Sequence, residues 1–522
     1  MKTMREKSEE VRQRRAKLEL GGGPAAIETQ HRVGKLTARE RLDRLLDKGS
    51  FKEMELWAAS RKTGFEEVDS RELPADAVII GYGTIDGRPV CVYAQDFTVM
   101  GGTMGAVHAQ KVIKIMNRAI RWRVPCIGLV DSGGVRLQDG VTRHLNDSYS
   151  GMFPVHIAAS GVIPQISCTM GPCTAGAAYS PALTDFVFMV KGTSYQFISG
   201  PIAVKSVTFK EVTNEELGGA LVHARISGCC DLLAENDEDC IKRCRELLSY
   251  LPLNNKEKPP FVDTGDDPER RDEELLDVVP VDNRKPYDMH KVIRLLVDNG
   301  RFFELKAEFA RNMVTGLCRL GGFSVGVIAN NPLFLGGSID VDAADKEARF
   351  IRFCDAFNIP LLFLVDSPAY MPGVDQEHKG IIRHGAKVLY AISEATVPKI
   401  TIYLRKMYGG ASPAMCNEPS GCDVLLAWPI LEQGVMDATA VVNIIYGKEI
   451  KAAANPAERF EQRLNEYKQK FADFPYHSGA CRWVDDIIDP RDTRSLVIRA
   501  LRMLQDKPID ARPWKKHGNM PV

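Results

Sequence analysis

The sequence predicts an α/β protein built from two tandem domains that repeat one another. Residues 101–132 align with residues 336–367 without gaps at an offset of 235, and both copies contain a Gly-Gly pair, a Pro and the run Leu-Val-Asp-Ser. The match continues after a one-residue slip, where residues 163–180 align with residues 397–414 at an offset of 234. Strand-like and helix-like segments alternate in each copy, which is typical of parallel sheets with right-handed β–α–β crossovers.

Each copy is expected to begin with a β-hairpin. The stretches AVIIGYGTIDGRPVCVYAQDFT and TGLCRLGGFSVGVIANNP are rich in apolar residues and are interrupted by turn signals. These signals are Asp86-Gly87 in the first copy and Gly321-Gly322 in the second, and such pairs favour tight hairpin turns.

A helix and a buried strand are expected after each hairpin. Val112, Ile113, Ile115, Met116 and Ala119 recur at helical spacing, which predicts an amphipathic helix of about 20 residues. The runs PCIGLVDS and PLLFLVDS follow this helix in the two copies, and their continuous apolar character indicates a strand buried inside a sheet.

The domain boundary is expected in a polar linker. A chain of 522 residues exceeds one ordinary core, so we expect one domain over residues 1–260 and a second over residues 261–522. Residues 252–285 are rich in Pro, Asn, Asp and Glu and lack apolar periodicity, which is typical of a linker.

Helices are also expected at both ends of the chain. Residues 1–50 indicate a helical arm, in which Thr37 is a candidate N-cap with Glu40 three residues later. Residues 493–505 predict another helix, followed by a Pro-containing tail.

Composition and charge exclude several classes of protein. Lys plus Arg equals Asp plus Glu at 68 each, which argues against a general binder of nucleic acid or of membrane surfaces. The opening MKTMREKSEEVRQRRAKLEL is too charged for a signal peptide, and the apolar runs have the length of strands, so no direct membrane insertion is expected. The thirteen Cys form no CxxC pair, which indicates reduced thiols in a cytoplasmic protein and no metal site.

Two turns of small residues are candidates for chemistry. Each follows a predicted strand and starts a predicted helix, at residues 174–177 (Thr-Ala-Gly-Ala) and 408–411 (Tyr-Gly-Gly-Ala). Two backbone N–H groups at such a turn form an oxyanion hole, which stabilises an enolate or a similar anion without a charged side chain. Tight helix–strand packing is the alternative explanation of a single small-residue turn. Their matching positions in the repeat favour a functional role.

Other catalytic motifs are absent from the sequence. There is no GxSxG nucleophile elbow, no GxxxxGK[ST] phosphate loop and no HExxH metal motif.

A set of longer stretches supports a family resemblance. They are GKLTARERLDRLLD, QDFTVMGG, DSGGVRLQDGV, SGVIPQIS, YSPALTDFVFMVK, VKSVTFKEVTNEELGGA, RFCDAFNIPL, GIIRHGAKVLYA, ATVPKIT and RPWKKHGN. A chain with these stretches in this order resembles the biotin-dependent acyl-CoA carboxyltransferase subunits. In that family, it looks most like propionyl-CoA carboxylase β subunits, the central subunit of methylmalonyl-CoA transcarboxylase and methylmalonyl-CoA decarboxylase α subunits.

The resemblance implies a fold and a reaction. It implies two crotonase-like domains, with acyl-CoA on the N-terminal side and biotin on the C-terminal side. The carboxyl group would move between carboxybiotin and the α-carbon of an acyl-CoA, with propionyl-CoA and methylmalonyl-CoA as the pair. Biotin would come from a separate biotin carboxyl carrier protein, served by a biotin carboxylase or a decarboxylase subunit. A hexamer is implied, with an active site between the N-terminal half of one subunit and the C-terminal half of another.

The resemblance also implies roles for single residues. The N–H groups of Ala175 and Gly176 would hold the thioester oxygen, and those of Gly410 and Ala411 would hold the ureido oxygen of biotin. The residues expected around biotin are Tyr408, Gly409 and Ser412. The residues expected around the acyl-CoA are Gly133, Gly134, Tyr179 and Pro413.

Several positions depart from the family pattern. Ala175 stands where the family usually has Gly, DSPAYMPGVDQ replaces a commoner Val-Pro-Gly-Phe-Leu-Pro-Gly, and Asp437, Ala438 and Thr439 replace small residues. Pro413 stands where the family carries a residue that sorts acyl groups. The identity of the acyl-CoA and the direction of transfer therefore stay open. A decarboxylase or transcarboxylase subunit acting on another acyl-CoA and a non-catalytic scaffold subunit are the alternatives.

Overall fold

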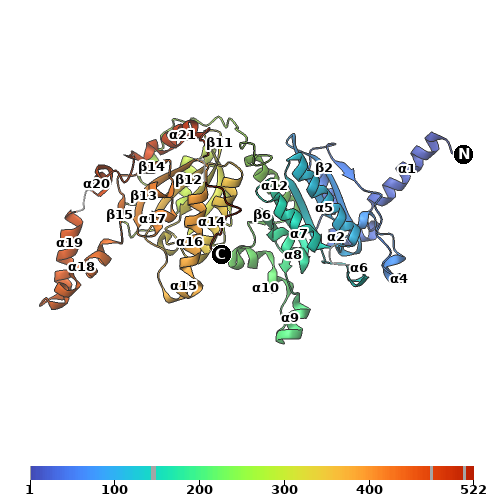
Figure 1. The fold of residues 1–522 in the computed structure, drawn as a ribbon, viewed down its shortest axis with the longest axis horizontal. Helices are drawn as coiled ribbons and strands as arrows, with labels where there is room; N and C mark the ends of the chain where they lie inside the picture. Colours follow the sequence, from blue (N-terminus) through green and yellow to red (C-terminus); the bar gives the residue numbers. More distant parts are fainter. Residues whose placement is uncertain (1, 143–147, 471–473, 510–512) are drawn as a thin grey trace. The chain divides into compact units, whose positions relative to one another are not determined.

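The protein divides into two compact units, which are described separately. The structure is a computed structural model that describes residues 2–142, 148–470, 474–509 and 513–522, so Arg512 of the RPWKKHGN stretch lies outside the described residues. The units are Met1–Lys258 and Pro259–Val522 (Figure 1). Within the described ranges, no helix combines the length and the apolar character needed to cross a membrane.

The N-terminal unit contains one eight-stranded sheet covered by helices. Its strands are β1 (Lys52–Met54), β2 (Val78–Ile85), β3 (Arg88–Gln95), β4 (Cys126–Ser132), β5 (Gln165–Thr174), β6 (Phe186–Val190), β7 (Tyr195–Phe197) and β8 (Leu232–Ala234). Its helices are α1 (Met4–Glu19), α2 (Pro24–Arg32), α3 (Ala38–Leu45), α4 (Glu66–Asp69), α5 (Ala106–Trp122), α6 (Leu137–Thr142), α7 (Tyr149–Ala159), α8 (Gly176–Ala182), α9 (Pro201–Thr208), α10 (Asn214–Gly218), α11 (Ala220–Val222) and α12 (Asp237–Tyr250).

The C-terminal unit contains a second eight-stranded sheet. Its strands are β9 (Phe302–Leu305), β10 (Met313–Leu320), β11 (Phe323–Asn330), β12 (Leu361–Ser367), β13 (Lys399–Tyr408), β14 (Val424–Ala427), β15 (Glu432–Gly434) and β16 (Asp486–Ile487). Its helices are α13 (Met289–Leu296), α14 (Val341–Ala356), α15 (Val374–Lys379), α16 (Ile381–Glu394), α17 (Ala411–Ala414), α18 (Ala438–Ala452), α19 (Pro456–Lys470), α20 (Phe474–Ala480) and α21 (Thr493–Leu504).

The two sheets have the same topology. The strand order is β1-β2-β3-β4-β5-β6-β8 in one and β9-β10-β11-β12-β13-β14-β16 in the other. A short strand also pairs with the central strand of each, β7 with β5 and β15 with β13. The first hairpin of each sheet is antiparallel, whereas β3, β4, β5 and β6 run parallel, as do β11, β12, β13 and β14. The predicted α/β repeat is therefore confirmed.

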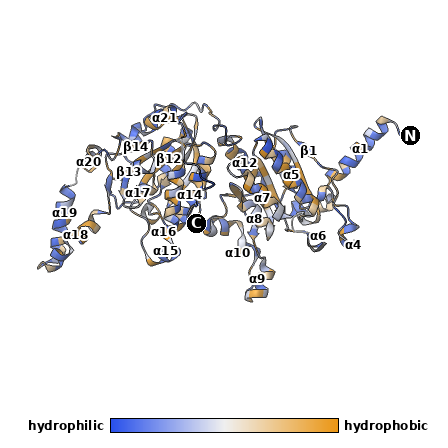
Figure 2. Cartoon of the chain, in the orientation of Figure 1, coloured by the Kyte–Doolittle hydropathy of each residue, from blue (hydrophilic) through white to orange (hydrophobic). Residues whose placement is uncertain are grey.

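Local sequence signals explain several elements. The hairpin turns fall at Asp86-Gly87 and Gly321-Gly322, as predicted. Thr37 and Glu40 form the expected capping box at the start of α3. By contrast, α1 buries no residue, and Figure 2 shows it as mostly hydrophilic.

A buried Asp interrupts the same strand of each sheet. The pairing register shifts between Val130 and Ser132 in β4, and at the equivalent place in β12, so Asp131 and Asp366 lie at β-bulges. Their backbone N–H groups donate to side-chain amide oxygens, Gln95 Oε1 at 3.1 Å and the repeat-equivalent Asn330 Oδ1 at 3.2 Å.

The two units neutralise this Asp differently. Lys35 and Arg41 from the helical arm each approach the Asp131 carboxylate to 2.8 Å. In the C-terminal unit, Arg405 on β13 itself reaches Asp366 at 2.9 Å. Gly171 is the repeat equivalent of Arg405, and a Cβ atom there would lie only 1.9 Å from Asp131 Oδ1. The helical arm thus provides the positive charge beside Asp131, whereas in the C-terminal unit Arg405 of β13 provides it beside Asp366.

Candidate active site

The turn of the N-terminal unit lies between β5 and α8. Ala175 joins them with φ 55° and ψ −126°, a conformation that L-residues rarely adopt. Its N–H donates to the carbonyl oxygen of Phe197 at 2.9 Å, and its own carbonyl accepts from Ala178 at 3.0 Å. Among the described residues, the N–H groups of Gly176 and Ala177 have no acceptor. The turn therefore offers two adjacent unpaired donors.

The turn of the C-terminal unit repeats this arrangement. Gly409 follows β13 with φ 55°, and its N–H donates to the carbonyl oxygen of Gly434 at 2.9 Å. Ser412 donates its N–H to Gly409 at 3.1 Å, as Ala178 does to Ala175. The N–H groups of Gly410 and Ala411 find no acceptor in the part of the chain that the structure describes.

The pair of unpaired donors differs from the predicted pair in one half of the repeat. The prediction paired Ala175 with Gly176, but the hydrogen bond to Phe197 already uses the N–H of Ala175. The unpaired amides are those of Gly176 and Ala177, which correspond to Gly410 and Ala411 at the repeat offset of 234. Ala177 was missed by sequence reasoning, although the repeat alignment places it opposite Ala411.

The other residues predicted for the N-terminal site lie at the same end of the sheet. Thr174 Oγ1 donates to the carbonyl of Gly133 at 3.0 Å, which ties the Gly133-Gly134 loop to the turn. Gly134 has φ 100° and donates its N–H to Ser132 Oγ at 3.1 Å. Tyr179 lies on α8 with a half-exposed ring that meets Phe153 edge-on.

The residues predicted around the C-terminal turn are held by local hydrogen bonds. Tyr408 is buried and donates its hydroxyl to Glu432 at 2.7 Å. Burial raises the pKa of this tyrosine, and the nearby Glu432 charge raises it further. Ser412 Oγ accepts from Asn417 at 3.2 Å, and the carbonyl of Pro413 accepts from Ser420 Oγ at 3.1 Å.

A tyrosine lies against each turn. A Cβ atom added at Gly176 would lie 3.3 Å from Tyr149, and one added at Gly410 would lie 3.3 Å from Tyr370. The Tyr149 hydroxyl has polar neighbours, Ser132 Oγ at 3.3 Å and Gln95 Nε2 at 3.4 Å. The glycine at each turn therefore permits close contact with an aromatic ring.

One position that departs from the family pattern has a local structural role. Asp437 is the N-cap of α18, and its side chain accepts from the N–H groups of Thr439 at 2.9 Å and Ala440 at 3.2 Å. The acidic substitution thus stabilises a helix start.

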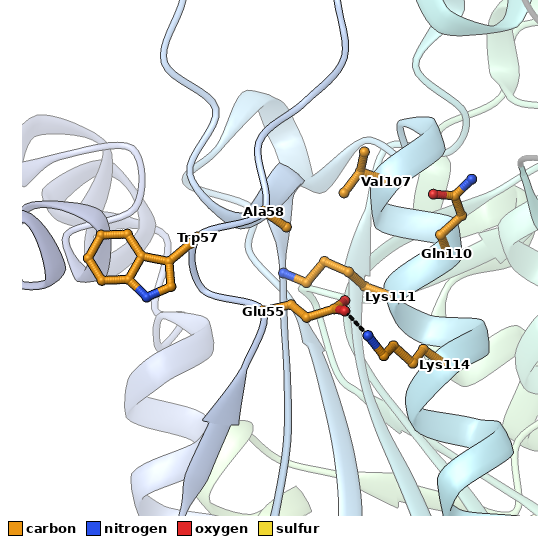
Figure 3. Close-up of a pocket in the computed structure, with 7 residues that line it drawn as sticks. All are labelled: Glu55, Trp57, Ala58, Val107, Gln110, Lys111 and Lys114. Atoms are coloured by element: carbon orange, nitrogen blue, oxygen red, sulfur yellow. Dashed lines mark hydrogen bonds and ion pairs between the residues drawn. The ribbon is translucent and has the colours of Figure 1, made fainter.

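A cleft of about 580 Å³ lies elsewhere in the N-terminal unit (Figure 3). It is lined by Glu55, Trp57, Ala58, Val107, Gln110, Lys111 and Lys114. Lys114 pairs with Glu55, and the Lys111 ammonium donates to backbone carbonyls. Both lysines are thus already paired, and neither turn contributes a residue to this cleft.

The chain matches a known family over most of its length. Residues 29–520 match the model of the carboxyl transferase domain. The chain is 49% identical over 522 residues to the propionyl-CoA carboxylase carboxyltransferase subunit of Haloferax mediterranei, covering 100% of both chains. It is equally 49% identical, over 100% of both chains, to the methylmalonyl-CoA decarboxylase subunit alpha of Veillonella parvula.

Solved structures agree with this match. A crystal structure of transcarboxylase 12S with methylmalonyl-coenzyme A and methylmalonic acid bound has a TM-score of 0.95 and 47% sequence identity, covering 100% of this chain and 99% of that one. The chain therefore belongs to the carboxyl transferase domain family, with a crotonase-like two-domain fold. It is an enzyme, a carboxyltransferase of the propionyl-CoA carboxylase and methylmalonyl-CoA transcarboxylase type.

Proposed function

We propose that this enzyme moves a carboxyl group between biotin and the α-carbon of a short acyl-CoA, with propionyl-CoA and methylmalonyl-CoA as the pair. The observation that carries the proposal is the duplicated turn, in which each unit presents two adjacent unpaired amides. The names of the relatives support the substrate class, since they contain propionyl-CoA or methylmalonyl-CoA. These relatives include a carboxylase and a decarboxylase, so they leave the direction open.

In this proposal the N-terminal turn binds the thioester. The N–H groups of Gly176 and Ala177 donate to the thioester oxygen, which gains negative charge when the α-proton leaves. Preorganised amides stabilise that charge more in the transition state than in the ground state, and no charged side chain is needed. Ala175 contributes through its backbone conformation, which joins β5 to the start of α8.

The C-terminal turn is proposed to bind biotin, and its residues fit that group. A Cβ atom at Gly409 would lie 2.8 Å from the carbonyl oxygen of Val435, so glycine leaves the turn free of side chains. Carboxybiotin, when bound, supplies the carboxyl group for transfer. Gly410 and Ala411 donate to the ureido oxygen, while Tyr408 and Ser412 hold the surrounding backbone.

The acyl group is proposed to lie against residues that include Pro413. Gly133, Gly134 and Tyr179 are proposed to contribute from the N-terminal half of another subunit. Pro413 offers a rigid apolar surface and no N–H, which suits a short acyl group without polar atoms.

The enzyme is also proposed to need partners. The sequence contains no Met-Lys-Met biotinylation site, so a separate biotin carboxyl carrier protein and a biotin carboxylase or decarboxylase subunit are expected. A hexamer is proposed because the similar transcarboxylase 12S assembles as a hexamer in its crystal structure. A cytoplasmic location is part of the same proposal.

The test is decarboxylation of methylmalonyl-CoA with free biotin by wild-type chain and two variants. Gly410 has φ −64°, which proline also adopts, so Gly410→Pro removes the N–H with little change of backbone. Gly410→Ala is the matched control, because it adds the same Cβ and keeps the N–H. We expect Gly410→Pro to lower kcat by about 10²–10³-fold relative to Gly410→Ala, as for other lost oxyanion donors.

Two outcomes would contradict this proposal. Equal turnover by the two Gly410 variants would exclude this amide as a donor. If folded wild-type chain turned over none of a panel of acyl-CoAs, the non-catalytic scaffold would be favoured.

A further inference from the structure

A buried tyrosine connects two parts of the predicted acyl-CoA site. Tyr149 is the first residue of α7, and a Cβ atom added at Gly176 would lie 3.3 Å from both Cβ and Cδ2 of this tyrosine. The hydroxyl of Tyr149 lies 3.3 Å from Ser132 Oγ, which also accepts the N–H of Gly134 at 3.1 Å. Tyr149 therefore joins the Gly133-Gly134 loop to the turn that presents the Gly176 amide.

The side-chain amide of Gln95 holds the same hydroxyl. Its Oε1 accepts the backbone N–H of Asp131 at 3.1 Å, which identifies Nε2 as the donor end of the amide. Nε2 donates to the Tyr149 hydroxyl at 3.4 Å and lies 3.3 Å from Nε2 of His108. Burial lowers the pKa of His108 to about 3, so this imidazole is neutral and its Nε2 can accept. Both hydrogens of the Gln95 amide thus have acceptors, one of which is Tyr149.

The C-terminal unit is built differently at this place. Asn330 is the repeat equivalent of Gln95 and also accepts the N–H of a bulge residue, but its Nδ2 donates to the sulfur of Met415 at 3.5 Å. The tyrosine that lies against that turn is Tyr370, and its buried hydroxyl has no hydrogen-bond partner among the described residues. The two units thus share the bulge and its amide acceptor, whereas the amide bonds to a tyrosine in the N-terminal unit.

The position of the Gly176 amide matters for the proposed reaction. An oxyanion donor is effective when its N–H is fixed toward the oxygen before charge develops. Helix α8 has seven residues, and so short a helix depends on packing for its stability. Gly176 has no side chain of its own to pack, and the three atoms nearest to a Cβ atom built there all belong to Tyr149. The Tyr149 side chain is therefore the packing support of the first residue of α8.

We propose that Tyr149 is a positioning residue: its hydroxyl, held by Ser132 and Gln95, keeps the ring against Gly176 and so fixes the direction of the Gly176 and Ala177 amides. The effect on catalysis rests on the proposed function, whereas the hydrogen bonds of the hydroxyl do not.

A thermal unfolding cycle of the full-length chain tests the hydrogen bond between Tyr149 and Ser132 without an activity assay. The variants are Tyr149→Phe, Ser132→Ala and the double variant. We expect Tyr149→Phe to lower the melting temperature by about 2–4 °C in the wild-type background, as for the loss of one buried hydrogen bond. In the Ser132→Ala background the same change should lower it by less, because the serine hydroxyl is already gone. Equal shifts in both backgrounds would overturn the connection.

Kinetics with free biotin and methylmalonyl-CoA test the positioning role. Tyr149→Phe should lower kcat about tenfold, less than loss of a donor, with an unchanged KM for methylmalonyl-CoA, because the ring supports the turn and not the bound substrate. Tyr149→Leu also removes the ring and should be slower still. Ser132→Ala should lower kcat as well. Its matched control is Ser367→Ala at the equivalent position of the repeat, where the hydroxyl donates to the carbonyl of Ala369 at 3.4 Å, so kcat should keep its wild-type value.

The outcomes separate this inference from the proposed function. If folded Tyr149→Phe has the wild-type kcat, or if it raises KM alone, the positioning role is excluded. If the Gly410 variants behave as proposed while Tyr149→Leu is as active as wild type, the positioning role fails and the proposed function stands. If wild-type chain is inactive, the proposed function fails and the positioning role with it, while the unfolding cycle still decides the hydrogen bond.

Discussion

Replacing Ala175 by glycine should stabilise the N-terminal unit. Ala175 has φ 55° and ψ −126°, a region in which the Cβ atom crowds the backbone. Such strained residues cost about 1–3 kcal/mol each. Glycine removes that cost but makes the unfolded chain more flexible, which opposes the gain by about 0.4–1 kcal/mol. The net expectation for Ala175→Gly is a gain of about 1 kcal/mol.

The gain should appear as a higher melting temperature. For a unit of this size, 1 kcal/mol corresponds to a rise of about 2–4 °C, which differential scanning fluorimetry can measure. Gly409→Ala is the reciprocal control, because it places a side chain at φ 55° and a Cβ atom 2.8 Å from the Val435 carbonyl oxygen. That variant should lose about 2 kcal/mol or more.

Activity provides a second readout of the same change. The N–H of Ala175 is paired with Phe197, so kcat of Ala175→Gly should equal that of wild type. An Ala175→Gly variant that melts at or below the wild-type temperature would refute the strain argument. A stabilised variant that loses turnover would mean that the strain itself serves catalysis.

Three further predictions concern buried charge, pH and thiols. Arg41→Met removes one cationic partner of the buried Asp131 carboxylate. In urea unfolding, this variant should lower the free energy of unfolding by about 3–5 kcal/mol, and a loss below about 1 kcal/mol would contradict the expectation. Burial lowers the pKa of His108 to about 3 in the folded chain, whereas histidine in an unfolded chain has a pKa of about 6.5. Between these two pH values the unfolded chain binds more protons than the folded chain, so the free energy of unfolding falls as the pH drops below about 6.5. His108→Gln should therefore flatten the plot of unfolding free energy against pH between about 5.5 and 6.5, and an unchanged slope would count against it. Cys229 and Cys481 are the exposed thiols and should react first with a thiol reagent, as read by peptide mass spectrometry; faster labelling of a buried Cys would be inconsistent with the fold.

The repeat and its turns could be predicted because their signals are local. Gly-Gly pairs, a Pro before an apolar run and small residues after a strand are visible in the sequence, and each marks an element that the structure contains. The amide donors could be predicted only to within one residue. Whether the N–H of Ala175 is paired depends on the carbonyl of Phe197, which β7 brings to the end of β5 through tertiary pairing.

The surroundings of the turns were harder to predict. In the stretch Asp345-Lys346-Glu347 the sequence is typical of an exposed helix face, yet Lys346 and Glu347 are buried. Lys346 is held by the carbonyls of Lys306 and Phe309, each 2.8 Å from its ammonium. A charged side chain can be buried where distant backbone groups form hydrogen bonds with it, and no local sequence pattern shows which groups these are.

In the proposed function, the two turns bind different oxygens with the same pair of backbone amides. Both turns present the same pair of N–H groups, and an amide donor does not distinguish a thioester oxygen from a ureido oxygen. Discrimination must therefore come from the surroundings, and there the copies differ. Tyr149 lies against one turn with its hydroxyl close to polar neighbours, whereas Tyr370 lies against the other with a buried hydroxyl that has no hydrogen-bond partner among the described residues. In the proposed function, a duplicated turn with different surroundings lets one fold bind two different reactants, because the surroundings can differ while the pair of donors stays the same.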